Sequence, residues 1–148
     1  MTDSSYQQIA NLIAQYAFAT DDGDFAGLGR LFSRSSFALN GGEPVRGAAA
    51  VTDLAFRVLQ TYDDGTPRTR HVTTNLFIDI DEQAGTASAR SYFTVFQSLP
   101  TLPLQAIAVG HYRDQFSRDD TGAWRFAARE VSTDFTGDVS HHVRAPAP

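Results

Sequence analysis

The first half of the chain combines helical periodicity with one short apolar run. Apolar residues recur every three or four positions over residues 4–20, which predicts an amphipathic helix that the serines at its start can cap. Asp24 is suited to cap a second, short helix, and the helical period returns over residues 47–62. Between these helices, the apolar run 37–39 ends in Asn-Gly-Gly, which predicts a strand followed by a turn.

The second half of the chain has the pattern of antiparallel strands. Four segments are rich in β-branched and aromatic residues, and polar turns at 81–85 and 118–122 join them in pairs, which predicts two hairpins. The predicted strands span residues 69–80, 86–97, 105–117 and 124–135. The last segment, 137–148, shows no period, so we expect it to be irregular or frayed.

Helices followed by antiparallel strands predict an α+β architecture, in which the helices cover one face of a long sheet. Strands this long in a chain of 148 residues must bend, and a sheet curved around helices encloses a pocket suited to a small apolar ligand. The strand 69–80 carries apolar residues on both faces, including Val72 and Phe77. Its outer face therefore needs a cover, and we expect a homo-oligomer.

Length and composition narrow the classes of protein that fit. The 148 residues suit a single domain, which we expect to span residues 1–136, ahead of the tail 137–148. A net charge of −5 provides no positive field for nucleic acid or anionic lipid. The absence of cysteine excludes disulfides, thiolate metal sites and cysteine nucleophiles.

Targeting and cofactor signals are also missing from the sequence. No apolar run approaches the roughly 18 residues that span a bilayer. The polar start lacks the features of a signal peptide, so we expect a cytoplasmic protein with no membrane partner. There is no phosphate-binding glycine loop and no dinucleotide fingerprint, so we expect no cofactor.

Asp21 and His71 are the first candidates for chemistry. Asp21 follows a strongly apolar helix face and begins the turn between the first two predicted helices. His71 lies on a predicted strand and, because side chains alternate, is expected to share a face with Thr73 and Asn75. This polar stripe suggests the wall of a wet cavity. A plainer interpretation makes Asp21 a turn or cap residue and His71 a hydrogen-bonded core histidine.

One arginine and three tyrosines extend the set of candidates. Arg129 lies in the middle of the last predicted strand, where a buried cation needs a partner. Arg125 shares its face, so one of the two could simply be solvated. Tyr16, Tyr92 and Tyr112 lie in elements predicted to be buried, and each could either line the pocket or fill the core.

The remaining histidines show no metal-binding pattern. His111 lies on the face opposite Tyr112, so we expect it to be structural or at an interface. His141 and His142 lie in the tail, where the sequence assigns them no role. Because no H-x-H or H-x-x-x-H spacing is present, we expect no metal site that combines His71, His111 and a tail histidine.

Six short segments carry a resemblance to a known family. They are YAFATDDGD at 16–24, LF at 31–32, RG at 46–47, RHVTTN at 70–75, GHYRD at 110–114 and WRFAAR at 124–129. In this order and spacing, over residues 5–136, the chain resembles the SnoaL-like branch of the nuclear-transport-factor-2-like superfamily. The resemblance implies a cone-shaped fold, in which a curved sheet wraps around N-terminal helices and encloses a pocket.

The same resemblance implies cofactor-free elimination, the chemistry of scytalone dehydratase, bile-acid 7α-dehydratase and hexachlorocyclohexane dehydrochlorinase. Asp21 and His71 match the aspartate and histidine of their catalytic dyad. Arg129 matches an arginine that lies near the leaving group in the dehydrochlorinase. Thr20 stands where scytalone dehydratase has tyrosine, and residues 86–97 lack that enzyme's second active-site histidine. These two departures argue against scytalone as the substrate.

The residues and the resemblance together favour a dehydratase-type lyase acting on a small, mostly apolar cyclic or polyketide-like molecule. His71 would act as the base and Asp21 would orient it, while Arg129, a tyrosine hydroxyl or Asn75 would stabilise the developing anion. Isomerisation and cyclisation fit the same pair. We expect a trimer, because the elimination enzymes that the chain resembles are trimers, although dimers are frequent in the wider superfamily.

Two alternatives stay open from the sequence. The protein could be a non-catalytic ligand-binding or assembly module, as in the β subunits of ring-hydroxylating dioxygenases. It could also be an isomerase with a carboxylate base, for which Asp114 or Asp134 would have to project into the pocket. A carboxylate oxygen of Asp21 within about 3 Å of His71, at a cavity, would favour the histidine-dependent enzyme.

Overall fold

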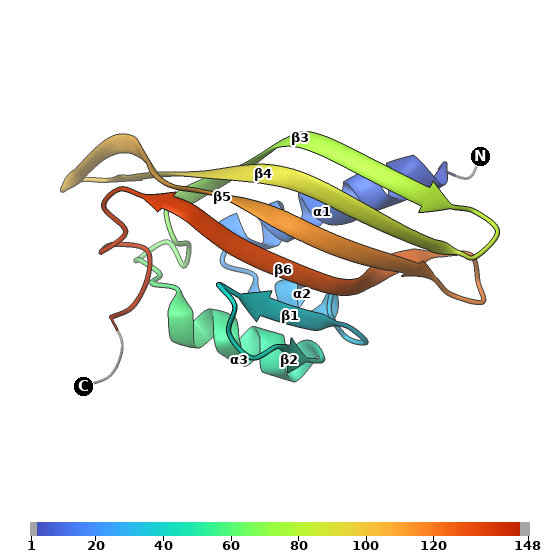
Figure 1. Ribbon diagram of the computed structural model, residues 1–148. Helices are drawn as coiled ribbons and strands as arrows, with labels where there is room; N and C mark the ends of the chain where they lie inside the picture. Colours follow the sequence, from blue (N-terminus) through green and yellow to red (C-terminus); the bar gives the residue numbers. More distant parts are fainter. Residues whose placement is uncertain (1–2, 146–148) are drawn as a thin grey trace.

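The computed structural model describes residues 3–145 and shows the expected α+β architecture (Figure 1). The elements in chain order are α1 (Ser5–Asp21), α2 (Phe25–Arg30), β1 (Ser36–Leu39), β2 (Val45–Arg46), α3 (Ala48–Val58), β3 (Thr69–Asp81), β4 (Thr86–Leu99), β5 (Leu102–Arg118) and β6 (Trp124–Thr136). The three helices lie against one face of the curved sheet, and its other face carries no helix from the described residues.

The six strands form one sheet in the order β2-β1-β6-β5-β4-β3. The long strands β3 to β6 pair antiparallel in two hairpins, as the sequence predicts. The short strand β1 adds to the edge of β6 in parallel, with Phe37 opposite Arg129. This parallel pair places β1 and β2 at the edge of the sheet opposite β3. The helix α3 follows β2 directly in the chain.

The helix ends follow the capping residues in the sequence. The Ser4 hydroxyl accepts a hydrogen bond from the backbone N–H of Gln7 at 3.1 Å, and the Asp24 carboxylate accepts one from Gly27 at 2.9 Å. The third helix is shorter than the predicted 47–62 and ends at Val58. Leu59 is already extended and forms a β-bridge with Val143, so a contact with the tail ends the helix.

Aromatic rings fill the space between the helices and one end of the sheet. The Phe32 ring lies 5.2 Å from that of Phe37 and 4.9 Å from that of Phe126, measured between centroids. Tyr16, on the buried side of α1, lies 5.6 Å from Tyr112 on β5. This packing closes the cone at its α2 end and leaves free space toward the other end.

A β-bulge in β3 overturns the expected placement of Asn75. The register with β4 shifts between Thr74 and Phe77, and Asn75 takes a positive φ of 55°. The inward-facing positions are therefore His71 and Thr73 before the bulge and Leu76 after it, and Asn75 is exposed. The expectation that Asn75 shares a face with His71 is wrong, because the bulge reverses the alternation between them.

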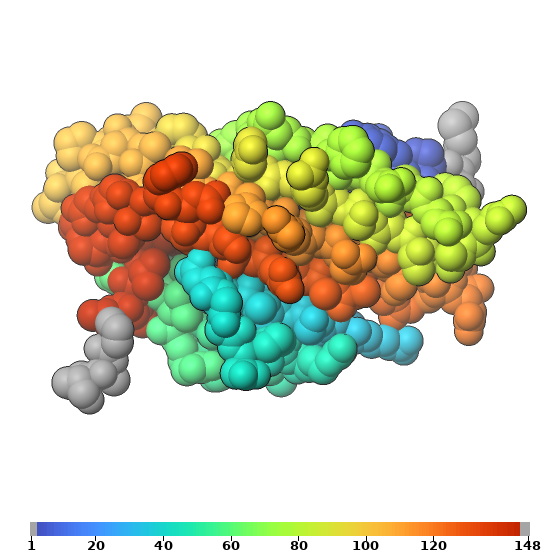
Figure 2. Space-filling model, viewed as in Figure 1, coloured from blue at the N-terminus to red at the C-terminus, as the bar shows by residue number. Residues whose placement is uncertain are grey.

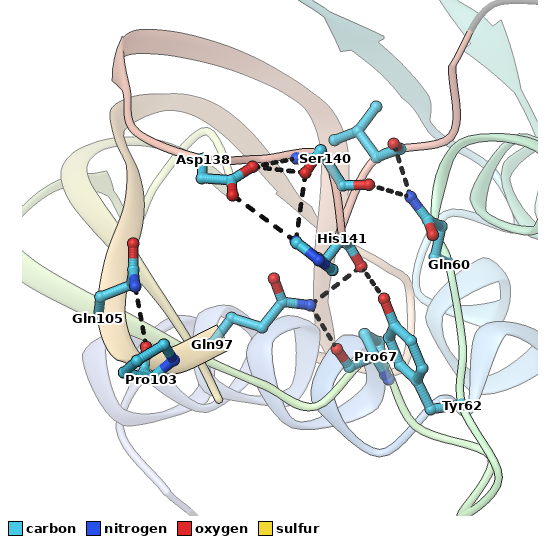
Figure 3. A network of polar contacts seen from close by, with 10 residues as sticks. Gln60, Tyr62, Pro67, Gln97, Pro103, Gln105, Asp138, Ser140 and His141 are labelled. Carbon is cyan, nitrogen blue, oxygen red and sulfur yellow. Dashed lines mark hydrogen bonds and ion pairs between the residues drawn. The ribbon is translucent and has the colours of Figure 1, made fainter. Parts of the chain in front are cut away.

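The tail residues 137–145 are irregular and are anchored by hydrogen bonds to the rest of the fold, whereas residues 146–148 of the expected tail lie outside the described residues (Figure 3). The Gln60 side chain donates to the carbonyl oxygens of Ser140 and Val143, at 2.8 and 2.9 Å. The His141 carbonyl accepts from the Tyr62 hydroxyl and from the Gln97 amide. These bonds hold residues 137–145 against the open end of the cone.

Candidate active site

A cavity of about 320 Å³ lies between the helices and the concave face of the sheet. Most of its lining is aliphatic or aromatic, and its polar groups are few. Apolar residues reach it from α1, α3, β4, β5, β6 and the tail: Tyr16, Val51, Leu54, Val58, Phe93, Val95, Tyr112, Val131, Val139 and Val143. Such a lining suits a small, largely apolar ligand whose few polar atoms meet specific side chains.

Asp21 and His71 meet at the wall of this cavity. An Asp21 oxygen lies 2.6 Å from His71 Nδ1, and the second oxygen accepts the backbone N–H of His71 at 2.8 Å. The Thr69 hydroxyl donates a third bond to the same carboxylate, at 2.8 Å. The His71 side chain is 9 % exposed and that of Asp21 is 7 % exposed. The carboxylate thus fixes both the ring and the backbone of His71.

Local structure brings these two distant stretches of chain together. Asp21 is the last residue of α1, and the turn after it continues through Gly23. Gly23 has a φ of 72°, and a Cβ there would lie 2.1 Å from the carbonyl oxygen of Gly65. Only glycine therefore allows the loop before β3 to pass so close to the end of α1. That close passage places Thr69 and His71 beside Asp21.

The electrostatics of the pair favour a charged Asp21. Burial opposes ionisation of this carboxyl, but the hydrogen bonds and positive charge of His71, with the bond from Thr69, outweigh it. The net result is a lowered pKa for Asp21, which is ionised at neutral pH. His71 lines the cavity and Asp21 lies behind it. The imidazole is therefore the group that can touch a ligand, and Asp21 positions it.

Tyr16 and Tyr112 line the cavity, whereas Arg129 lies behind them. The Arg129 guanidinium stacks 4.3 Å from the Tyr16 ring centroid and 3.7 Å from that of Tyr112. It forms a two-point ion pair with Asp114 at 2.7 and 2.8 Å, with both side chains fully buried. Direct contact between Arg129 and a ligand in the cavity is therefore not available in this structure.

Burial controls the protonation of the two tyrosines. It raises the pKa of Tyr16 to about 12, although the positive charge of Arg129 acts in the opposite direction. Burial also raises the pKa of Tyr112 well above its usual value. Both hydroxyls stay protonated at neutral pH, so each keeps a hydrogen atom that it can donate.

Asn75 and Tyr92 lie on the outer face of the sheet, away from the cavity. Tyr92 is 55 % exposed, and both residues border a shallow surface depression beside His111. His111 forms its own pair there, with Nδ1 2.9 Å from Asp134. The expectation that Asn75 and Tyr92 face the cavity is wrong: a bulge redirects Asn75, and strand alternation directs Tyr92 outward while its neighbour Phe93 points in.

Several polar residues of the cavity were not predicted as site residues: Thr20, Asn40, Thr133, Thr136 and, buried in the tail, His142. His142, in the tail, is 6 % exposed and lines the cavity with its ring centroid 5.9 Å from that of His71. The tail has no hydrophobic period, so the sequence offered no means to place this residue. The only feature of the sequence that could have drawn attention to His142 was the pair of adjacent histidines in a segment with few other polar side chains.

The structure supplies two further observations over residues 3–145. Within that range, no group of three or more His, Asp or Glu side chains is arranged to hold a metal ion. None of the helices described there is long and apolar enough to cross a membrane.

Solved structures with the same fold include several proteins from bacteria. A Mycobacterium tuberculosis protein of unknown function, Rv3472, is 26 % identical with a TM-score of 0.72, over 90 % of this chain and 74 % of that one. A candidate scytalone dehydratase from Novosphingobium aromaticivorans is 23 % identical with a TM-score of 0.70, over 97 % and 91 % of the two chains.

A protein described as NTF2-like with a cystatin-like fold, also from N. aromaticivorans, is 23 % identical with a TM-score of 0.71. The match covers 91 % of this chain and 85 % of that one. These likenesses establish the fold. A comparison with curated proteins gave no match. The model of the SnoaL-like domain family matches residues 3–130. Because this match covers most of the chain, the protein belongs to the family of SnoaL-like domains.

Proposed function

We propose that the protein is a cofactor-free lyase that removes a proton from a carbon atom of a small, mostly apolar molecule. Dehydration of a cyclic or polyketide-like substrate is the reaction we favour, and isomerisation and cyclisation begin with the same step. The observation that carries the proposal is the 2.6 Å contact between Asp21 and His71 Nδ1 at the wall of an apolar cavity.

The contact gives each residue a distinct role. A carboxylate on Nδ1 keeps the proton of neutral His71 on that nitrogen, so Nε2 presents its lone pair to a substrate. When Nε2 takes up a proton, the negative charge of Asp21 stabilises the imidazolium. His71 is thus the proposed catalytic base, and Asp21 is the proposed positioning residue.

The elimination can be completed with groups already at the cavity. His71 removes a proton, and the electron pair of that C–H bond, directly or by way of an adjacent carbonyl group, forms the new double bond when a hydroxide leaves the neighbouring carbon. The departing oxygen takes the proton back from His71 and leaves as water. Tyr16 or Tyr112 can donate a hydrogen bond to the oxygen that becomes negative during the reaction.

The cavity and the buried charges make the two alternatives weaker. An isomerase with a carboxylate base would need Asp114 or Asp134 in the cavity. Asp114 is instead paired with Arg129 in the buried core, and Asp134 is paired with His111 on the outer face of the sheet. A non-catalytic module has no need of a buried Asp–His pair beside an open cavity. No specific observation favours either one.

The test is turnover of bicyclic β-hydroxy ketones, including the β-hydroxy derivative of α-tetralone, whose dehydration yields fluorescent α-naphthol. We expect His71→Ala and Asp21→Ala each to lower kcat/KM by about 10²- to 10⁴-fold, because the first removes the base and the second removes the carboxylate that orients it and stabilises its charge. Circular dichroism would confirm that both variants remain folded.

The second His–Asp pair on the outer face provides a matched control. His111→Ala and Asp134→Ala remove the same chemical groups at a similar distance but outside the cavity. We expect turnover to be unaffected by these two changes. Undiminished turnover in His71→Ala would contradict the proposed mechanism, and a panel with no substrate at all would favour the binding module.

A further inference from the structure

His142 is a buried polar residue that the proposed mechanism does not use. It is 6 % exposed, lines the cavity, and packs with its ring 5.9 Å from that of His71. Within residues 3–145, neither of its ring nitrogens has a hydrogen-bond partner, and Nδ1 is fully enclosed. Nε2 is thus the ring atom left to meet a ligand.

Burying an imidazole without a hydrogen-bond partner lowers the stability of the fold. Leaving a buried polar group without a partner costs about 1–3 kcal/mol, so leucine or phenylalanine would serve packing better. Burial, together with the charge of His71, lowers the pKa of His142 to about 4, against the opposing effect of Asp21. The ring is therefore neutral at physiological pH and able to donate or accept one hydrogen bond through Nε2.

The backbone around His142 is fixed from several sides. Its N–H donates to the Val139 carbonyl at 3.0 Å, and its own carbonyl accepts from the Gln60 N–H at 2.9 Å. Immediately before it, the His141 carbonyl is held by Tyr62 and Gln97 (Figure 3). An irregular segment with this many anchors presents the His142 ring in one position rather than many.

We propose that His142 is a substrate-binding residue whose neutral imidazole donates a hydrogen bond to a carbonyl oxygen next to the carbon that His71 deprotonates. This inference rests on the proposed function and deepens it by naming a substrate class, apolar ketones with an acidic α-hydrogen. The proximity of the two rings suits it, because such a carbonyl oxygen and the α-carbon are separated by only two bonds.

The pair of histidines then divides the work of enolate formation. His71 takes the α-proton, and the electron pair of the C–H bond moves onto the carbonyl oxygen. His142 holds that oxygen through Nε2–H without losing its own proton. The electron pair returns to expel hydroxide from the β-carbon, which leaves as water with the proton from His71. A neutral donor suits this position because it adds no second positive charge beside the imidazolium.

The test is the equilibrium binding of two probes of nearly equal shape, α-tetralone and its oxygen-free analogue tetralin. We expect the intact protein to bind the ketone about five- to tenfold more tightly than does His142→Phe, with tetralin bound equally by both. Heteronuclear NMR should show the His142 ring nitrogens shifting when the ketone binds and not when tetralin binds. His142→Leu replaces His142→Phe if the latter does not fold.

His141→Phe is the matched control, since His141 lies next in the chain but does not line the cavity. It should retain the full affinity for the ketone. Equal affinity of the wild type and His142→Phe for α-tetralone, or ring nitrogens that do not respond to it, would overturn the inference. Because binding is measured without turnover, this result is independent of whether His71→Ala loses activity.

Discussion

The Asp21 carboxylate acts on both the side chain and the main chain of His71. Its two oxygens accept three hydrogen bonds, from His71 Nδ1, the His71 backbone and the Thr69 hydroxyl. A side chain that only oriented the ring would need one of these bonds. The additional bonds fix where β3 begins relative to α1, so the geometry of the pair is built into the fold.

His142 is expected to make stability depend on pH. Its folded pKa, about 4, lies below its ordinary value of 6.5, so the unfolded chain binds a proton more readily than the folded one. The free energy of unfolding should therefore fall as the pH drops from 6.5 to 4, by about 3 kcal/mol from this group alone. The neighbouring titratable groups are His71 and Asp21.

Urea unfolding at pH 7 and pH 4 measures this effect. We expect His142→Phe to lose about 3 kcal/mol less stability than the wild type between the two pH values. His141→Phe, with a partly exposed ring, should behave like the wild type. Identical losses in wild type and His142→Phe would show that the ring is not held in its neutral form.

At the scale of single elements, the bulge in β3 determines which side chains reach the cavity. Asn75 adopts a φ of 55°, which asparagine tolerates and β-branched residues do not. We expect Asn75→Val to destabilise the fold by about 1–2 kcal/mol and Asn75→Gly to change it by less than about 1 kcal/mol. Chemical denaturation of both variants checks this, and equal losses would contradict a backbone origin.

The pairing of β5 with β6 places Asp114 opposite Arg129 in the sheet. Both side chains are fully buried, and the Asp114 charge outweighs burial to raise the pKa of Arg129 above its usual value. Asp114→Ala would leave this cation without a counter-charge, so we expect a loss of about 3–5 kcal/mol.

A double-mutant cycle separates charge from packing at this pair. The double variant that combines Asp114→Leu with Arg129→Met removes both charges and keeps apolar volume. It should therefore lose much less free energy of unfolding than Asp114→Ala. The measurement is the free energy of unfolding of the two single variants and the double variant. Additive losses would mean that the ion pair carries no coupling.

At the scale of the whole molecule, the outer face of the sheet exposes several large apolar side chains. Figure 2 shows this face, formed by β3 to β6. Its outward positions include Val72, Phe77, Tyr92 and Phe96, which are between 36 and 61 % exposed. Large exposed apolar patches of this kind commonly mark interfaces.

We therefore expect a homo-oligomer that buries this face, and we expect it to be a trimer. Light scattering coupled to size exclusion would give the mass of the assembly. Phe77→Glu should dissociate it, because the change introduces charge into the exposed apolar face. Phe18→Glu, at an exposed position on α1, is the control. A monomeric wild type at micromolar concentration would contradict this expectation.

The amino-acid sequence determined the elements, the fold class and the family. Helical and alternating periods are local signals, and they located α1 and the four long strands within a few residues. Gly23 and the aspartates near it marked the turn that ends α1. Asp21 and His71 were identified together because the resemblance covers nearly the whole chain.

Only the tertiary structure decided which side chains share the cavity. A one-residue bulge turned Asn75 outward, pairing with Asp114 placed Arg129 behind the tyrosines, and long-range hydrogen bonds brought His142 inward. Bulges, buried ion pairs and anchored tails depend on partners far along the chain. Their positions leave no period in the sequence, because the contacts that fix them form only when the whole chain folds.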